Sequence, residues 1–468
     1  MRVLFDLSSL IRWRGPKVGM IRAQQELARY LRGSGSEIVF TVFDPYLNRP
    51  RAIRPEWVDR VIENEASVEP ALLWNAAGRD RPLLRRLPRP IGNSLFWLTR
   101  FRRKLISELE RGLFVNGKQG GWRERLVRRL IKDRERSLYL NDDGSLRPCP
   151  PLDMILDDTL QIVSGDVFIS AQADWYHINL EAIIAEQRRG LRRVVLCYDI
   201  IPILFPEWYG EKDAVAFGGY YARSFATADR VIFNASINER DARSFCRSLG
   251  FDLTDSRIVP LGSDFSAPSG KRSLPAGLQP GRYAVFVSTI EPRKNHNMLV
   301  DVWSRLSADG VIHKADFKLV LAGRSGWKME KFFADLTANP EFGRSIFHLE
   351  SLGDDLIKTL YAEAAFSLYP SIYEGFGLPP IESMLAGAPV IASTGGAIPE
   401  VVGDAGICLD PHDPDAWYRE IKRMIDDESH RQSWADRARS YRQVTWRESA
   451  ERFVAAVEEP FGTRSAFF

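Results

Sequence analysis

The chain has 468 residues, 45% hydrophobic and 27% charged, which is enough for two or three globular domains with ordinary cores. Its four cysteines are widely spaced without a Cys-x-x-Cys pair, which argues against a disulfide framework or a structural zinc site. The net charge of +3 conceals 18 Lys and Arg against 6 Asp and Glu in residues 79–136, so the rest of the chain carries −9.

The N-terminal part reads as the start of an α/β domain. Residues 1–7 predict a buried strand. They do not resemble a signal peptide, because Asp6 interrupts the long apolar segment that a signal peptide has. A loop with Gly19 and an amphipathic helix follow, and residues 37–43 predict the next strand. The Gly-x-Gly-x-x-Gly spacing of a dinucleotide fold is absent here, which argues against a nicotinamide enzyme.

Residues 46–150 predict a helical insertion that contains the basic region 79–136. Arginines alternate there with Leu, Phe and Trp, a mixture typical of helices that lie in an anionic membrane surface. Two other interpretations stay open. The basic face could simply be solvated, or it could bind nucleic acid, which is less favoured because no nucleic-acid-binding module is recognisable. No run of about 18 apolar residues indicates a membrane-spanning helix, so we expect a cytoplasmic protein, peripheral at most on the inner face of the membrane.

The strand–helix alternation resumes at Asp166. A buried strand over 192–197 runs into Tyr198 and Asp199. Asp199 fits either a carboxylate that binds a sugar or acceptor hydroxyl, or an ordinary loop cap after a strand. The Gly-, Pro- and Ser-rich stretch over 266–281 predicts an interdomain linker with a boundary near residue 275.

The second alternating block places charged residues at strand ends. A strand over 284–288 leads to Arg293 and Lys294 at a helix start, where two cations can neutralise a diphosphate or simply be solvated. Gly323 and Arg324 follow the next strand, and ligands of open α/β sheets collect at such ends, so they are candidates to border a nucleotide base.

Residues 367–400 form the most informative stretch. They predict a strand, a glycine loop with Glu374, a helix opened by Pro379 and Pro380 that carries Glu382, and a second strand. Two carboxylates beside a helix N-terminus suit a ligand with hydroxyls at one end and phosphate at the other, such as a nucleotide-sugar. The alternative is a solvated loop acid and a helix-start acid favoured by the dipole.

Metal chemistry has little support in the sequence. Asp413 and Asp415 resemble an Asp-x-Asp metal site, but they precede a helix, where aspartates serve as caps. The six histidines show no metal-ligand spacing, and no Walker loop is present.

The residues Pro-Ser-x-Tyr-Glu-Gly-Phe-Gly-Leu-Pro-x-x-Glu, with the two glutamates separated by seven residues, closely resemble the signature of the retaining family 4 glycosyltransferases, also described as glycosyl transferases group 1. Glu-Pro-Arg-Lys-Asn at 291–295 is similar to a second motif of that family. The resemblance implies the GT-B fold of two doubly wound Rossmann-like domains facing a cleft. We expect an acceptor-side domain over 1–270, a nucleotide-sugar domain over 276–440, and a terminal helix in 441–468 that packs back toward the first domain.

The resemblance also implies roles for individual residues. Glu382 would bind the ribose and Glu374 the transferred sugar, while Arg293 and Lys294 would bind the donor phosphates. Gly19 would face the diphosphate from the other domain, although a plain strand-to-helix turn is the alternative there. Tyr198 stands where the family often has histidine, so a histidine acid/base role has no support at this position. The remaining donor contacts would come from Gly375, Phe376, Gly377 and Leu378.

These features predict a retaining, metal-independent hexosyltransferase without a cofactor. The donor would be a nucleotide-sugar, and the resemblance favours GDP-mannose. The acceptor would be a glycan or glycolipid, such as a lipid-linked oligosaccharide or a growing surface polysaccharide, and nucleic acid is not an expected partner. The alternative is a catalytically silent protein that keeps the fold and serves as a scaffold or binding protein at an anionic membrane.

Overall fold

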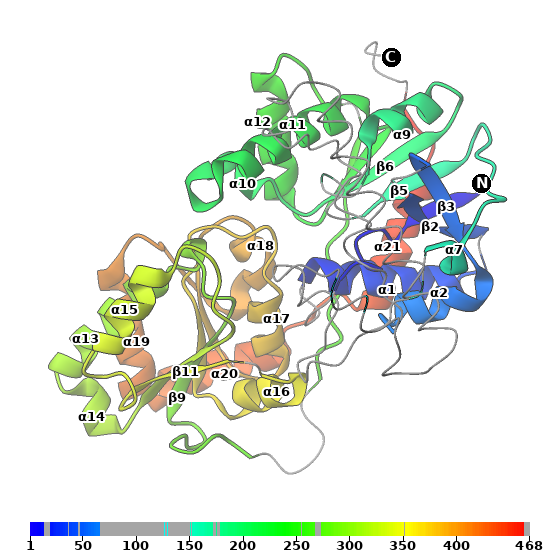
Figure 1. The fold of residues 1–468 in the computed structure, drawn as a ribbon. Coiled ribbons are helices and arrows are strands. Elements are labelled where there is room, and N and C mark those ends of the chain that lie inside the picture. The colour runs from blue at the N-terminus through cyan, green and yellow to red at the C-terminus, as the bar shows by residue number, and fades with distance from the viewer. Residues whose placement is uncertain are drawn as a thin grey trace. The chain divides into compact units, whose positions relative to one another are not determined.

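The computed structural model describes residues 1–13, 19–35, 37–44, 47–65, 152–171, 178–253, 255–266, 273–350 and 352–462, with four further positions between 126 and 175. The expected basic helical insertion, and with it nearly all of 79–136, lies outside these residues. The chain divides into two compact units, 1–196 with 219–231 and 459–468, and 197–218 with 232–458 (Figure 1).

An eight-stranded sheet contains the strands of the N-terminal half. Their order is β4-β3-β2-β1-β5-β6-β7-β8, and β2, β1, β5 and β6 run parallel. The strands are β1 Val3–Asp6, β2 Ile38–Asp44, β3 Arg49–Ile53, β4 Leu156–Asp157, β5 Val167–Ser170, β6 Arg192–Cys197, β7 Arg230–Phe233 and β8 Ser256–Ile258. The helices are α1 Gly19–Gly33, α2 Pro55–Ile62, α7 Leu152–Ile155, α9 Leu180–Gln187, α10 Ile201–Leu204, the 3-10 turn η3 Pro206–Trp208, α11 Glu211–Thr227 and α12 Ser236–Ser248.

The edge of this sheet differs from the sequence prediction. Strand β3 pairs antiparallel with β2, and β4 pairs antiparallel with β3, so the sheet is mixed and not purely parallel. Strand β3 and helix α2 also lie within 46–150, the segment assigned to the insertion. The first residues of that segment therefore belong to the sheet and its helices.

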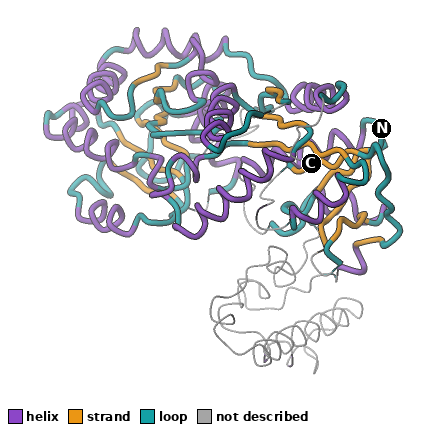
Figure 2. Tube along the Cα trace, turned by 90° about the horizontal axis from the view of Figure 1, so that it is seen from above, coloured by secondary structure: helices purple, strands orange, loops and turns teal. Residues whose placement is uncertain are grey.

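A six-stranded parallel sheet forms the centre of the second unit, with the order β11-β10-β9-β12-β13-β14. Its strands are β9 Tyr283–Val287, β10 Lys318–Ala322, β11 Ile346–Leu349, β12 Phe366–Tyr369, β13 Val390–Ser393 and β14 Ile407–Leu409. The accompanying helices are η4 Pro292–Lys294, α13 His296–Ala308, α14 Val311–Ala315, α15 Glu330–Ala338, α16 Asp354–Glu363, α17 Leu378–Leu385, α18 Ile398–Val402, η5 Gly403–Ala405, α19 Pro414–Asp426, α20 Glu428–Ser440 and α21 Trp446–Glu458. Strands (orange) alternate with enclosing helices (purple) in Figure 2.

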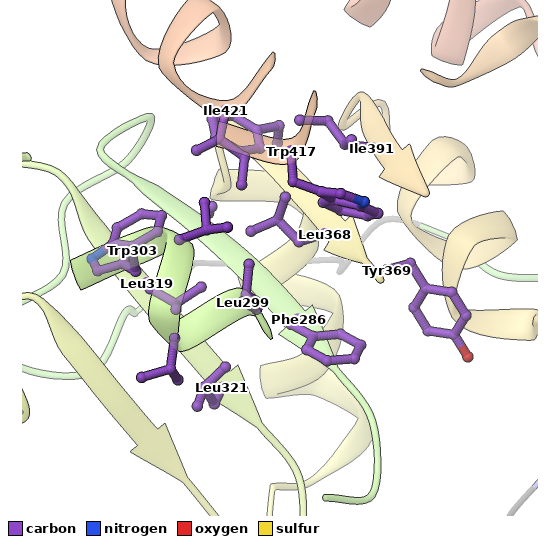
Figure 3. Packing of buried hydrophobic residues seen from close by; sticks show 14 of the residues in the cluster. Phe286, Leu299, Trp303, Leu319, Leu321, Leu368, Tyr369, Ile391, Trp417 and Ile421 are labelled. Carbon is purple, nitrogen blue, oxygen red and sulfur yellow. The ribbon is translucent and has the colours of Figure 1, made fainter. Parts of the chain in front are cut away.

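Both faces of this second sheet are buried. Along β9, Ala284 and Phe286 belong to one apolar cluster, whereas Tyr283 and Val285 belong to another. Because successive side chains of a strand point to opposite faces, the two clusters are the two sides of the sheet. Figure 3 shows the first cluster, in which Trp303 and Trp417 are fully buried. This packing on two faces is the doubly wound arrangement that the alternating sequence predicted.

The strand order of the second sheet creates a switch point. From β9 the chain proceeds through β10 to β11 on one side, and then returns to place β12 on the other side of β9. The loops that leave β9 and β12 therefore run in opposite directions, and in open α/β sheets the ligand crevice lies at the carboxyl ends of such strands. This is where ligands of open α/β sheets bind.

The described helices include none that is both long enough and apolar enough to cross a membrane. The domain boundaries expected from the sequence, including the linker near residue 275, stay predictions.

Candidate active site

The loops after β9 and β12 bring together a buried group of charges at the switch point. Arg293 Nη1 lies 2.6 Å from Glu374 Oε2, and Lys294 Nζ lies 2.5 Å from Glu374 Oε1. Arg293 also pairs with Glu291 at 2.7 Å. We call these four residues, Glu291, Arg293, Lys294 and Glu374, the charge cluster. Their formal charges cancel, so two cations are held at the crevice without a net charge.

Burial and pairing together set the ionisation of this cluster. Burial alone would raise the pKa of Glu374, but the positive charges of Arg293 and Lys294 outweigh it and lower that pKa to about 2. Burial opposes the charge on Arg293 as well, yet Glu374 and Glu291 keep its pKa well above the ordinary value. For Lys294, burial and then the neighbouring Arg293 lower the pKa. These shifts favour the charged forms of Glu374 and Arg293, and they make Lys294 the more easily neutralised of the two cations.

Tyr369, the last residue of β12, supports Lys294 from the core side. Its hydroxyl accepts a hydrogen bond from Lys294 Nζ at 2.9 Å, and Nζ lies 4.9 Å from the ring centroid. The ring packs edge-on against Phe286, and in Figure 3 the hydroxyl points away from the apolar cluster. His296, at the start of α13, stacks on Phe286 and is fully buried, which lowers its pKa to about 3. It is therefore neutral and adds no charge beneath Lys294.

The glycine loop after β12 leads into α17 as the sequence predicted. Gly377 adopts a left-handed conformation with φ 109°, which favours glycine, and prolines occupy the first turn of the helix. Leu378 is buried at the start of α17, Phe376 is buried in the loop, and Glu382 is half-buried one turn into the helix. Glu374 and Glu382 thus flank a helix N-terminus, where amide groups and the dipole favour an anion.

Backbone segments approach this loop so closely that only glycine fits at some positions. A Cβ on Gly396, whose φ is 63°, would lie 2.3 Å from the carbonyl oxygen of Glu374. The amide of Ala397 donates to that same oxygen at 2.9 Å. The loop after β13 therefore holds the backbone of Glu374 in position.

Asp199 belongs to the second unit and lies at this same loop. A Cβ on Gly375 would come within 2.7 Å of the Asp199 side chain, so the two predicted residues are neighbours. Asp199 Oδ1 accepts from the amide of Ile201 at 3.1 Å, which is the loop-cap role that the sequence left open. Burial raises the pKa of Asp199. A half-buried carboxyl beside the glycine loop also remains suited to a hydroxyl ligand.

The other candidates belong to other elements of the chain. Gly323 directly follows β10, a Cβ there would lie 1.9 Å from the carbonyl oxygen of Ser288, and Arg324 beside it is exposed. Gly19 begins α1 in the first unit and is exposed, and its proposed contact with a diphosphate stays a prediction. Asp413 caps α19 by accepting from the amides of Asp415 and Ala416.

Sequence reasoning did not assign Glu291 or Tyr369 to the site. Glu291 belongs to the Glu-Pro-Arg-Lys-Asn motif at 291–295, so its closeness to Arg293 in the sequence could have suggested the ion pair between them. Tyr369 ends an apolar strand and looks like a core residue. Its hydroxyl gains a role only because β12 lies beside β9.

A paired set of cations at the switch point, beside a glycine loop and a helix start, is an arrangement typical of nucleotide-binding sites in open α/β folds. Residues 277–441 match the family described as Glycosyl transferases group 1, so this part of the chain is similar to glycosyltransferases of that family. The matched residues contain the charge cluster, the glycine loop and Glu382.

Similar proteins include mannosyltransferases. The chain is 34% identical over 246 residues to an O-antigen chain mannosyltransferase B of Escherichia coli, covering 52% of this chain and 63% of that one. It is 30% identical over 208 residues to an MMP alpha-(1->4)-mannosyltransferase of Mycolicibacterium hassiacum, covering 43% and 48%. The chain thus spans less than two thirds of the length of these relatives.

The fold also resembles solved structures. Alr3699/HepE of Anabaena, crystallised with UDP and glucose, aligns with a TM-score of 0.56 at 13% identity, covering 98% of this chain and all of that one. This likeness confirms the expected α/β architecture of two Rossmann-like domains.

Proposed function

We propose that the protein transfers a hexose from a nucleotide-sugar to an acceptor hydroxyl with retention of the anomeric configuration. The observation that carries this proposal is the buried charge cluster at the switch point, within the residues that match the glycosyltransferase family. The relatives' names favour mannose as the sugar, and GDP-mannose is therefore the donor to test first.

Each part of the site has a task in this reaction. Arg293 and Lys294 would stabilise the negative charge that builds up on the departing diphosphate, an electrostatic contribution that is often among the largest in catalysis. Glu374 would accept hydrogen bonds from the transferred sugar, and Glu382 from the ribose. Because Glu374 already holds both cations, a bound diphosphate would share Arg293 and Lys294 with it.

The bond changes follow from the absence of an evident protein nucleophile among these residues. The acceptor oxygen would form a bond to the anomeric carbon on the face from which the diphosphate leaves. The bond from that carbon to the phosphate oxygen would break, and the acceptor's proton would pass to the departing phosphate. The two cations of the cluster, Arg293 and Lys294, stabilise the charge that develops in this step without donating a proton.

Two variants test the assignment. Glu382→Ala should weaken donor binding, seen as a smaller thermal shift with GDP-mannose, because a ligand stabilises only the state that binds it. Lys294→Met keeps the aliphatic stem and should lower kcat by roughly 10²- to 10³-fold, the scale for losing one electrostatic group. The exposed Lys331→Met serves as a matched control.

Unchanged turnover in both site variants would contradict the assignment. A wild-type protein that neither binds nor hydrolyses any of a panel of GDP-, UDP- and dTDP-sugars would instead support the catalytically silent scaffold.

We further propose that the acceptor is a lipid-linked or growing polysaccharide and that residues 79–136 bind an anionic membrane beside it. The local balance of +12 supports this, since each basic group near an anionic surface contributes on the order of 1 kcal/mol. Liposome sedimentation tests it, and binding that is indifferent to anionic lipid and to salt would contradict it.

A further inference from the structure

A group of aromatic side chains lies beside the charge cluster within the second unit. Phe205 and Trp208 stack with ring centroids 4.2 Å apart and planes 12° from parallel. Phe205 also contacts Tyr373 at 5.2 Å, and Tyr209 contacts Trp327 at 5.8 Å. We call these five residues the aromatic strip. They come from the segment around η3, from the loop after β10 and from the loop after β12.

Polar contacts fix the two main parts of the strip to each other. Trp327 Nε1 donates to the carbonyl oxygen of Trp208 at 2.8 Å. Lys328 Nζ donates to the carbonyl oxygens of Glu207 and Tyr209, at 2.7 and 2.6 Å. Three consecutive carbonyls of one turn are therefore bound by two adjacent residues. The rings are held in place before any ligand arrives, which reduces the entropy lost on binding.

The strip presents apolar surface to solvent. Trp327 is 43% exposed even though both its ring and its N–H have partners, so it is positioned without being buried. Leu204 and Val215 on the adjoining helices are also exposed. Trp327 is therefore accessible to a ligand while its position is fixed by its partners.

Both ends of the strip lead to the charge cluster. Tyr373 directly precedes Glu374, and its carbonyl oxygen accepts from Arg293 Nη1 at 3.3 Å. Gly326, which directly precedes Trp327, donates its amide to the carbonyl oxygen of Ile290 at 2.9 Å, and Ile290 directly precedes Glu291. The strip is thus continuous with the place where a hydroxyl would meet the donor.

We propose that the aromatic strip binds the saccharide acceptor, with a sugar ring stacked on Trp327 and the attacking end of the glycan beside Tyr209. A pyranose has an apolar face of C–H groups and a rim of hydroxyls. The exposed ring of Trp327 matches the apolar face, and the phenol of the adjacent Tyr209 can exchange hydrogen bonds with the hydroxyl rim, which a lipid chain lacks. This inference rests on the proposed function and adds the location of the acceptor.

The test compares two substitutions at one position, with mannotriose as acceptor probe and saturating GDP-mannose. Trp327→Ala removes the ring and should raise the KM for mannotriose by roughly tenfold, the scale of one aromatic contact. Trp327→Phe keeps a stacking face but loses the hydrogen bond to Trp208, and should change that KM by less than about threefold. Phe342→Ala, an exposed aromatic residue elsewhere in the same unit, should leave it unchanged.

Binding measured without turnover separates this proposal from the proposed function. Saturation-transfer NMR should show contact between mannotriose and the wild-type protein that Trp327→Ala weakens, while the thermal shift with GDP-mannose is retained. Equal losses in the Ala and Phe variants, an effect of Phe342→Ala as large as that of Trp327→Ala, or wild-type protein that binds donor but not mannotriose would overturn the proposal. Failure to bind any nucleotide-sugar would instead count against the proposed function.

Discussion

Replacing Glu374 with Gln tests the charge cluster most directly. The substitution keeps the size of the side chain but removes the charge that pairs with Arg293 and Lys294. The lowering of its pKa from 4.5 to about 2 corresponds to roughly 3 kcal/mol in favour of the folded state. Removal of one partner from a buried ion pair costs about 3–5 kcal/mol, which agrees in scale. At about 2–4 °C per kcal/mol for a domain of this size, Glu374→Gln should lower Tm by roughly 6–12 °C.

The pH dependence gives a second readout. Because the folded-state pKa is depressed, the contribution of Glu374 is fully present above about pH 4.5 and is lost as the pH falls through 4.5 toward 2. Urea denaturation at pH 7, 5 and 3.5 should therefore show a constant difference from wild type at the first two pH values and a smaller one at the third.

A double variant and a surface variant complete this experiment. Adding Lys294→Met to Glu374→Gln should recover part of the stability, because the cation left without its carboxylate is also removed while Arg293 keeps Glu291. Asp335→Asn breaks an exposed ion pair with Lys331 and should change Tm by about 1 °C or less. A Tm for Glu374→Gln within about 2 °C of wild type, or a double variant less stable than the single one, would refute the reasoning.

Two further predictions concern groups that hold the charge cluster. Tyr369→Phe keeps the ring but removes the hydroxyl that accepts a hydrogen bond from Lys294. We expect kcat to fall roughly tenfold and the KM for the donor to change by less than about threefold. An unchanged kcat would show that Lys294 does not depend on the Tyr369 hydroxyl. Gly396→Ala combines a positive φ with a Cβ 2.3 Å from the Glu374 carbonyl, and should lower stability by more than about 1 kcal/mol in urea denaturation and weaken donor binding in a thermal-shift titration. Wild-type affinity together with wild-type stability would contradict this account.

Patterns confined to one segment were predictable from the sequence. The stretch 367–400 forms β12, a glycine loop, α17 and β13 as expected, because proline, glycine and apolar runs act locally on the backbone. Helix α20 was not predicted. Ala438 is its buried residue, so it carries no apolar stripe that a periodicity argument could detect.

The sequence by itself determined which side chains are available for the chemistry, since the motif residues Arg293, Lys294, Glu374 and Glu382 can be named without a structure. It also determined a doubly wound fold, because apolar strands buried on both faces need helices on both sides.

Only the tertiary structure decided how those side chains combine. Lys294 and Glu374 are 80 residues apart and meet because the chain returns past β10 and β11 to set β12 beside β9. Trp327 and Trp208 are 119 residues apart and meet through a hydrogen bond between two loops. Neither pairing follows from local propensity, because each depends on the order in which the strands lie side by side. The same order brings two charged motifs, which alone would be solvated, into one largely buried cluster without a net charge.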